Sequence, residues 1–497
     1  VGGAGNATLT GLGGNDQFDI NTGDGVDTIT DAQAGDKIFY DGVELKGTAV
    51  NVSKGLYQLG ETFLMQEGRN LYITRGGNTG VIVKDYFPLG YQGATSQTNI
   101  GITIPAVSAS GPAPYSPVVA NAPDIKGNEL ANNMWDRAGF SENIYGYGGN
   151  DIIHSYGGGD LIDGGAGDDY ISGGRILIGG EGNDTLAASG RTVLLDGGTG
   201  DDELRPSSNS ELVLGGTGID TVHYNSSHGV QVDLRLAIQL GEIYNRYGQM
   251  TFNYAAGDVL SSIENVTGSG LGDTLIGDDR DNVIDGGGGY GGDILIGGGG
   301  VDVLLGRAGD DTLEGGIGAD RLDGGANIDT ASYTGSSAAV NVNLVRATQL
   351  GGDAQGDVLI DIENITGSAF NDALAGNNLA NRIDGGVGVD TVSYAGSSAG
   401  VDVNLTLALT REQTGGDAAG DRLFNIENII GSGFADTLAG NSLINRIDGG
   451  AGLDTISYFS ATAGVKVNLA LTTAQADGDT LVNIENITGW YYADTLT

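Results

Sequence analysis

Aspartates recur at a fixed interval in glycine-rich turns, and their carboxylates are the groups of this chain best suited to chemistry. Between residues 288 and 331, five aspartates follow one another at intervals of nine: Asp293, Asp302, Asp311, Asp320 and Asp329. The unit reads G-G-x-G-x-D-x-U-x, where U is aliphatic. Ca²⁺ prefers carboxylate and carbonyl oxygens, and glycine lets the backbone turn its carbonyls toward one point. The spacing therefore predicts a series of calcium sites.

A second run, from residue 147 onward, has intervals of nine and then of eighteen. If each nonapeptide forms half a coil, eighteen residues return the chain to the same edge. One edge then keeps the motif, while the other has lost it at Val193 and Glu211. The further aspartates predicted to bind calcium are Asp16, Asp27, Asp151, Asp160, Asp169, Asp184, Asp202, Asp220, Asp273, Asp372, Asp390, Asp436 and Asp454. The glycines predicted to contribute are Gly165, Gly167, Gly298, Gly300, Gly316 and Gly318.

A longer repeat built from the same half-coils follows residue 220. Within it, an Ile-Glu-Asn triplet places a glutamate nine residues before a motif aspartate, as Glu363 precedes Asp372. Each long repeat has an insertion after a tyrosine (Tyr224, Tyr333, Tyr394 and Tyr458). The insertions alternate apolar and polar residues, which predicts a β-hairpin or β-arm leaving the roll. The loops at 351–357 and 415–421 fit either additional calcium sites or plain polar turns.

Composition excludes several classes of protein. The 497 residues include 92 glycines, 64 acidic and 22 basic residues, so the formal net charge is −42. Such a surface is unsuited to nucleic acid or an anionic membrane. There is no cysteine, which excludes disulfides and thiol catalysis. No apolar run approaches about 18 residues, so we expect no transmembrane segment. The chain starts at Val1 and stops inside a repeat, so we expect it to be part of a longer or processed protein.

The predicted fold class is all-β: a parallel β-roll with inserted β-hairpins or arms and a small antiparallel β unit. Residues 36–104 contain aromatic-rich short strands, and residues 105–123 are rich in proline. The predicted divisions are a roll fragment at 1–35, the antiparallel unit at 36–104, a linker at 105–123, β-roll at 124–222, a repeat with an insertion at 223–331, long repeats at 332–392 and 393–456, and a partial repeat at 457–497.

These repeats resemble the RTX, or haemolysin-type, calcium-binding repeat family of large bacterial secreted proteins, over roughly residues 2–35 and 140–497. The nonapeptide itself is a known mark of that family. The resemblance implies a right-handed parallel β-roll, calcium held by the turn aspartates and glycine carbonyls, type I secretion and folding outside the cell. Two departures stand out: asparagine at 282, 381 and 445, and glutamate at 264, 363, 427 and 485. We expect these turns to bind calcium weakly or to be purely structural.

Function is expected to follow from the calcium-loaded roll itself. A site with a dissociation constant of ~10⁻⁴–10⁻³ M adds about 1.4 kcal/mol at tenfold excess, so on the order of ten sites would decide folding. We expect a non-enzymatic extracellular structural or adhesive protein, such as an S-layer, fibre or adhesin segment. Its expected partners are further copies of itself or a cell-surface polysaccharide. The alternative is a folding and secretion module of a larger enzyme or toxin.

Overall fold

The fold is described from a computed structural model. It describes residues 124–136, 142–157, 160–190, 192–236, 239, 242–244, 250–406, 412–459, 461, 463–469, 478–489 and 493–497, and, before residue 124, short strand segments between residues 8 and 103. The chain divides into two compact units, residues 1–269 and 270–497, and each is described by itself.

The start of the first unit contains an antiparallel meander. Its strands are β7 (Val50–Ser53), β8 (Leu56–Leu59), β9 (Thr62–Glu67), β10 (Asn70–Thr74) and β11 (Gly80–Val83), each paired with the next. Glu67 lies opposite Asn70 at the hairpin between β9 and β10. Strand β3 (Val26–Ile29) pairs in parallel with β11. The antiparallel prediction for this region is confirmed, with a parallel strand added at the edge.

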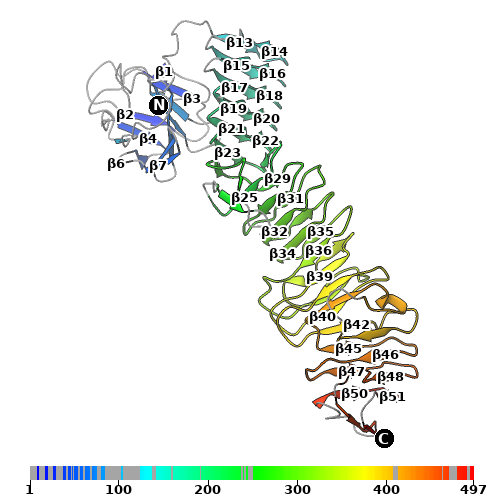
Figure 1. Ribbon diagram of the computed structural model, residues 1–497. Coiled ribbons are helices and arrows are strands. Elements are labelled where there is room, and N and C mark those ends of the chain that lie inside the picture. Colours follow the sequence, from blue (N-terminus) through cyan, green and yellow to red (C-terminus); the bar gives the residue numbers. More distant parts are fainter. Residues whose placement is uncertain are drawn as a thin grey trace. The chain divides into compact units, whose positions relative to one another are not determined.

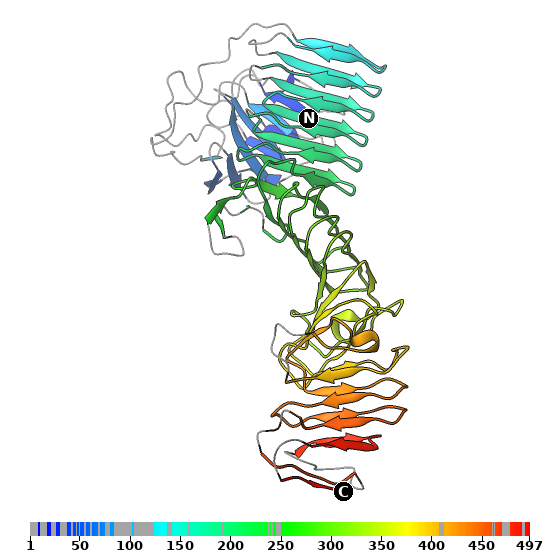
Figure 2. The same cartoon turned by 45° about the vertical axis from the view of Figure 1, so that its right-hand side comes forward.

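From residue 124 onward, the first unit contains a parallel β-roll made of two stacks of strands, which appear as successive rungs (Figure 2). One stack contains β13 (Ile125–Asn128), β15 (Asn143–Gly148), β17 (Leu161–Ala166), β19 (Ile176–Glu181), β21 (Leu194–Thr199), β23 (Leu212–Thr217) and β28 (Val259–Ser261). The other contains β14 (Asn133–Trp135), β16 (Ile152–His154), β18 (Tyr170–Ser172), β20 (Thr185–Ala187), β22 (Glu203–Arg205), β24 (Thr221–His223) and β29 (Asn265–Thr267). The chain visits the stacks alternately, so two half-coils complete one coil.

The aliphatic U residues form a thin core between the two stacks. Ile162, Leu177 and Leu195 stack in register on neighbouring strands, and all are fully buried. Because side chains alternate along a strand, the residues on either side of each U face away from this core. In the stack that contains β17 to β28, several of these outward residues are also apolar and buried, in a cluster of Leu161, Ile176, Ile178, Leu194, Leu212, Leu214 and Val259.

The second unit is also built from stacks of parallel strands (Figure 1). The first stack contains β30 (Thr274–Ile276), β32 (Ile294–Gly299), β34 (Thr312–Ile317), β36 (Thr330–Ser332), β39 (Asn364–Thr366), β41 (Arg382–Asp384) and β44 (Arg422–Phe424). Along the chain, the first strands of this stack alternate with those of a second stack, which contains β31 (Val283–Asp285), β33 (Val303–Leu305), β35 (Arg321–Asp323) and β38 (Val358–Ile360). A third stack contains β37 (Asn341–Asn343), β40 (Ala373–Ala375), β42 (Thr391–Ser393), β45 (Asn428–Ile430), β47 (Arg446–Asp448) and β50 (Thr480–Val482). A fourth contains β43 (Asp402–Asn404), β46 (Thr437–Ala439), β48 (Thr455–Ser457) and β51 (Asn486–Thr488). The last is the pair β49 (Lys466–Val467) and β52 (Thr495–Leu496). The prediction of an all-β parallel roll is confirmed.

The insertions of the long repeats behave in two ways. The first contains the predicted antiparallel hairpin, β26 (Glu242–Tyr244) with β27 (Met250–Phe252). In the later ones, the inserted strand joins the roll: β37 pairs in parallel with β40, and β43 with β46. Each such strand begins a new stack, so the prediction that these insertions leave the roll is wrong. The predicted hairpin is present in reduced form, as an antiparallel bridge between Asn341 and Leu350 and another between Asp402 and Thr414. Burial does not distinguish the insertions, because Val232 in β25 (Gln231–Asp233) of the first insertion is as fully buried as Val342 and Val403.

Candidate metal sites

The motif aspartates form a hydrogen-bonded ladder along each edge of the roll. The Oδ1 atom of one aspartate accepts the backbone N–H of the aspartate one coil earlier, as Asp169 accepts from Asp151 at 2.7 Å. In the second unit Asp293, Asp311 and Asp329 share one edge, and Asp302 and Asp320 share the other. The predicted half-coil of nine residues is therefore confirmed, since neighbours in space are eighteen apart in sequence.

In the part of the chain that the structure describes, the second carboxylate oxygen of most motif aspartates is buried and has no hydrogen-bond partner. This holds for the Oδ2 atoms of eleven of them: Asp151, Asp169, Asp184, Asp202, Asp220, Asp302, Asp311, Asp320, Asp329, Asp390 and Asp454. A buried carboxylate oxygen without a partner is costly, because nothing replaces its lost hydration. These atoms therefore mark the places where the turns need a further ligand.

The unpartnered oxygens point into spaces that only glycine leaves open. A Cβ atom built on Gly197 would collide with Asp202 Oδ2 and with the carbonyl oxygen of Gly215, one coil further on. Gly179 is placed in the same way between Asp184 Oδ2 and the Gly197 carbonyl oxygen. Oxygens from two successive turns thus converge on one small space. A carboxylate and carbonyls are the donor set that Ca²⁺ takes, so the residues present fit a calcium ion shared between coils.

The electrostatics of the turns favour a bound cation. Burial, followed by the nearby charges of Asp202 and Asp169, raises the pKa of Asp184 to about 8. Burial also raises the pKa of Asp169 and of Asp202 to about 7. Without a cation these carboxyls repel one another in a desolvated setting and tend to hold protons. A bound divalent cation would stabilise the charged form and compete with those protons.

The glycines predicted as ligands occupy the same turns. Gly165, Gly167, Gly298, Gly300 and Gly316 have φ between 94° and 128°, the left-handed region that favours glycine. The carbonyl oxygens of Gly298 and Gly300 lie against the glycines one coil later, Gly316 and Gly318. The carbonyl oxygen beside the aspartate Oδ2, however, belongs in several turns to the first glycine of the pair, such as Gly164 or Gly315. Beside Asp220, Asp329, Asp390 and Asp454 it belongs instead to Ser262, Asp361, Asn425 and Asn483. The sequence analysis did not single out these first glycines, although the double glycine is a visible signal.

Five predicted aspartates of the described turns lack this orphaned atom. Ser155 donates its hydroxyl to Asp160 Oδ2. Ser368 and Ser432 donate backbone N–H groups to the Oδ2 atoms of Asp372 and Asp436. Asp273 and Asp293 follow one another in a ladder, with 2.8 Å between Asp273 N and Asp293 Oδ1. Asp16 lies outside the described residues, and Asp27 lies in β3, where the side chains are not described.

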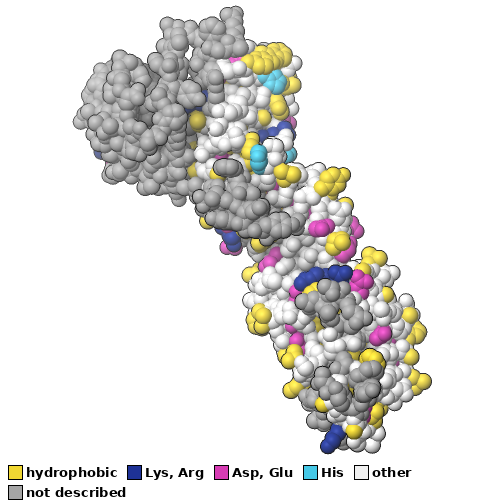
Figure 3. Space-filling view, viewed as in Figure 1, with side chains coloured by type: hydrophobic (Ala, Val, Ile, Leu, Met, Phe, Trp, Pro, Cys, Tyr) yellow, Lys and Arg dark blue, Asp and Glu magenta, His cyan; other side chains and the backbone are white. Residues whose placement is uncertain are grey.

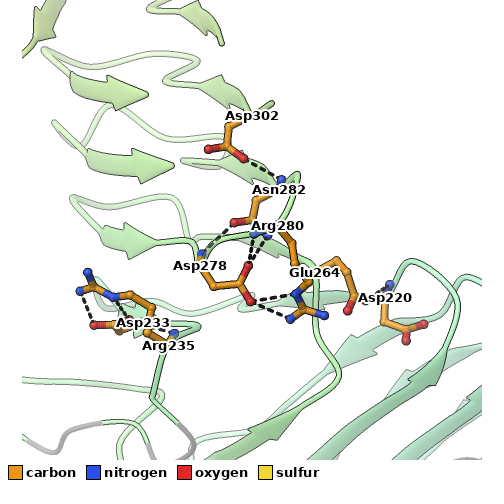
Figure 4. A network of polar contacts seen from close by, with 8 residues as sticks. All are labelled: Asp220, Asp233, Arg235, Glu264, Asp278, Arg280, Asn282 and Asp302. Atoms are coloured by element: carbon orange, nitrogen blue, oxygen red, sulfur yellow. Dashed lines mark hydrogen bonds and ion pairs between the residues drawn. The ribbon is translucent and has the colours of Figure 1, made fainter. Parts of the chain in front are cut away.

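The substitutions at motif positions keep the ladder intact. Glu264 accepts the backbone N–H of Asp220 at 3.0 Å, and Asp302 accepts that of Asn282 at 2.8 Å (Figure 4). Asn381 goes further, because its side-chain amide donates to the Glu363 carbonyl oxygen at 2.7 Å, and Asn445 repeats this contact with Glu427 at 2.8 Å. In these two turns the asparagine N–H group binds the carbonyl oxygen, a role that we assign to a cation in the aspartate turns.

At the ends of three stacks, a buried tyrosine donates a hydrogen bond to the second oxygen of the last carboxylate. The sequence analysis did not predict this role. The Tyr333 hydroxyl donates to Asp357 Oδ2 at 3.0 Å, while Asp357 Oδ1 accepts from Asp320 N at 2.9 Å. Tyr224 with Asp258 and Tyr394 with Asp421 make the same bond, at 3.0 and 2.9 Å. The loops at 351–357 and 415–421 are therefore polar turns whose final carboxylate is already satisfied. A tyrosine recurring before each insertion was the available signal.

Comparison with known families agrees with this geometry. The family model described as the RTX calcium-binding nonapeptide repeat (4 copies) matches residues 140–175, 178–210, 296–331, 361–396 and 430–458. The chain carries RTX calcium-binding repeats. RTX repeats bind Ca²⁺, and the ladders of buried carboxylates lie within the matched segments and continue between them. No curated protein matches the chain. Among the described residues, no helix has the length and apolar character needed to cross a membrane.

Proposed function

We propose that this RTX protein is an extracellular structural or adhesive component, such as part of an S-layer, a fibre or an adhesin, which folds on binding calcium and then self-associates. The observation that carries the proposal is the set of eleven motif aspartates with a buried, unpartnered oxygen. They lie on successive turns through both units. Calcium is thus a component of the roll's interior, and the roll is the bulk of the chain.

Calcium dependence explains where such a chain would work. Outside the cell, calcium is abundant enough for sites with dissociation constants of ~10⁻⁴–10⁻³ M to fill. At low calcium the buried carboxylates repel one another and oppose compaction. The chain would then stay extended during type I secretion and fold on release. The proposed role is non-catalytic, because it rests on the loaded roll as a material.

Apolar side chains exposed on the turns support lateral association. Ile328, Val387, Val389 and Leu453 stand in turns of the second unit, Ile317 is the last residue of β34, and all five are exposed. Hydrophobic side chains recur along the described surface of that unit (Figure 3). They take no part in the core, whose U positions are filled by other residues. Repeated exposed apolar groups are typical of interaction surfaces, and a repeating roll presents them at regular intervals.

Self-association is tested by light scattering and negative-stain microscopy during a calcium titration of the full chain. We expect filaments or sheets at millimolar calcium, and reduced assembly in a Val387→Ser, Val389→Ser double variant. An Asn378→Ser variant changes an exposed polar residue in the same unit and should assemble as the parent does. A monodisperse monomer at millimolar calcium and high protein concentration would contradict self-assembly. It would favour the alternative, a calcium-triggered folding and secretion module of a larger enzyme or toxin.

A polysaccharide is the second proposed partner, and a group of rings favours it. Trp135 stacks on His154 with ring centroids 6.4 Å apart, and His154 contacts Tyr170 edge-on at 5.7 Å. Trp135 is exposed. Flat, exposed aromatic faces suit the apolar faces of sugars. Affinity electrophoresis against surface polysaccharides should show retardation that Trp135→Ala removes, and equal mobility of the two proteins would exclude this partner.

A further inference from the structure

Three carboxylates gather at the first two coils of the first unit, in an arrangement that differs from the RTX turn. Asp136, Glu142 and Asp160 each place an oxygen within 4.8 Å of the others. Their exposed fractions are 8%, 6% and 0%. In the part of the chain that the structure describes, this is the one group of three or more acidic, histidine or cysteine side chains with such a spacing.

Strand register shows how these turns depart from the motif. Trp135 pairs with His154, so Asp136 stands beside Ser155, and Asn143 pairs with Leu161, so Glu142 stands beside Asp160. In an RTX turn the position of Ser155, five residues before the aspartate, is a glycine that leaves space for an ion. Here serine and aspartate side chains occupy that position. The glycine-lined space of the motif is replaced by a group of side-chain carboxylates.

The protein donors around the group do not suffice for three carboxylates. The Ser155 hydroxyl lies 2.9 Å from Asp136 Oδ2 and 2.5 Å from Asp160 Oδ2, but its single proton serves one of them at a time. The backbone N–H of Tyr156 donates to Asp136 Oδ1 at 2.8 Å, and that of Glu142 to Asp160 Oδ1 at 2.7 Å. Glu142 Oε2 is buried and has no hydrogen-bond partner among the described residues. A nine-tenths buried carboxylate with an unpartnered oxygen beside two others calls for a positive ligand.

We propose that Asp136, Glu142 and Asp160 hold one divalent hard cation, Ca²⁺, which ties the turn of the first coil to the turn of the second. Oxygen-only donors select calcium over softer metals that take nitrogen and sulfur. Because two of the ligands come from one turn and the third from the next, the ion fixes the register at the start of the roll. This site goes beyond the proposed function, since it uses no motif glycine and requires no self-assembly.

Terbium luminescence of the full chain tests the site, because Trp135 is next to Asp136 in sequence and can sensitise Tb³⁺. In a Trp490→Phe background, Trp135 is the only tryptophan. Excitation of tryptophan should give saturable Tb³⁺ emission in this parent, at least tenfold weaker in Glu142→Gln and in Asp136→Asn. Asp311→Asn, a matched loss of one carboxylate charge at an RTX turn of the second unit, should leave the emission unchanged. Circular dichroism in calcium confirms that each variant is folded.

A second measurement needs no variant. Crystals of the full chain grown with Tb³⁺ should show an anomalous peak among the three carboxylates. Occupied RTX turns without a peak at this position would overturn the proposal, as would parental Tb³⁺ emission in both carboxylate variants. A peak here in a protein that stays monomeric would retain this site while rejecting self-assembly.

Discussion

The same ladder of carboxylates occurs on the Asp151–Asp220 edge of the first unit and in the long repeats of residues 332–497. The two regions differ in what binds the second carboxylate oxygen. On the Asp151–Asp220 edge, five consecutive aspartates leave Oδ2 without a partner. In the long repeats, Tyr394 fills that role for Asp421, and Asn381 supplies an amide in place of a carboxylate. Among the described aspartates of these repeats, Asp390 and Asp454 alone keep the orphaned oxygen. One backbone arrangement can thus be completed by a cation or by the protein.

The pKa values of Asp184 and Asp421 differ in this sense, although those of Asp220, raised to about 6, and Asp357, raised to about 7, stand in the reverse order. Asp184 and Asp421 are both almost fully buried. Burial raises the pKa of Asp184 to about 8, with neighbouring aspartates adding to the rise. Burial raises the pKa of Asp421 only to about 6, because hydrogen bonds from Asn381 and Tyr394 lower it again. A neutral donor stabilises a lone carboxylate, but a column of adjacent carboxylates needs positive charge.

Removing calcium should have the largest effect and should separate the two regions. In excess chelator we expect amides of β16, β18, β20, β22 and β24 to lose protection from hydrogen exchange. Those of β41, β45 and β47 should retain more of it, because their turns contain protein donors. Mass-spectrometric exchange with and without calcium measures both sets in one sample. Equal loss of protection in the two regions would show that the tyrosine and asparagine donors do not replace the ion.

Acidification should act next most strongly, and in an unusual direction. With chelator present, the folded-state pKa values of Asp169, Asp184 and Asp202, at about 7 to 8, lie above the unfolded value of about 3.9. Protons therefore bind the folded state more tightly, and stability is greatest below about pH 4 and falls as pH rises through 7 to 8. Thermal unfolding of the ion-free chain across this range measures the effect. Stability that increases with pH between 6 and 8 would contradict it.

Removing one tyrosine hydroxyl should have a smaller, local effect. Tyr333→Phe leaves Asp357 Oδ2 buried without its donor, which should cost about 1–3 kcal/mol. Urea unfolding in chelator measures the loss, and calcium should restore part of it if the freed oxygen can bind an ion. Tyr290→Phe removes a hydroxyl from a side chain that is 89% exposed and serves as the control. Equal stability of the two variants would assign no role to the buried bond.

Exchanging an amide for a carboxylate should give the smallest effect. Asn381→Asp removes the donor to the Glu363 carbonyl oxygen and adds a charge to the ladder. We expect a loss of about 1 kcal/mol in chelator and its recovery at millimolar calcium. Asn378→Asp places the same charge on an exposed side chain nearby and should show neither change. If the stability of Asn381→Asp is the same in chelator and in millimolar calcium, this turn cannot be converted into an ion site.

The sequence by itself determined the period, the two edges and the core. A spacing of nine with one aliphatic residue per unit fits a half-coil in which the aspartates and the U residues face opposite ways. The U residues Leu313 and Leu322 are fully buried. Glycine at fixed positions determined the turns, since those positions require a left-handed backbone or leave no room for a Cβ atom. These features are local and repeat, so a pattern in one chain reveals them.

Only the tertiary structure decided which oxygens already have partners. The bond from Tyr333 to Asp357 spans 24 residues, and Glu142 meets Asp160 through the register of β15 with β17. The later insertions likewise became part of the roll because β37 and β43 pair with strands one coil further on. Such contacts depend on how one coil lies on the next, and parallel pairing fixes that between residues far apart in sequence. The nine-residue spacing alone therefore marks every motif aspartate alike, and stacking distinguishes those that need an ion from those that do not.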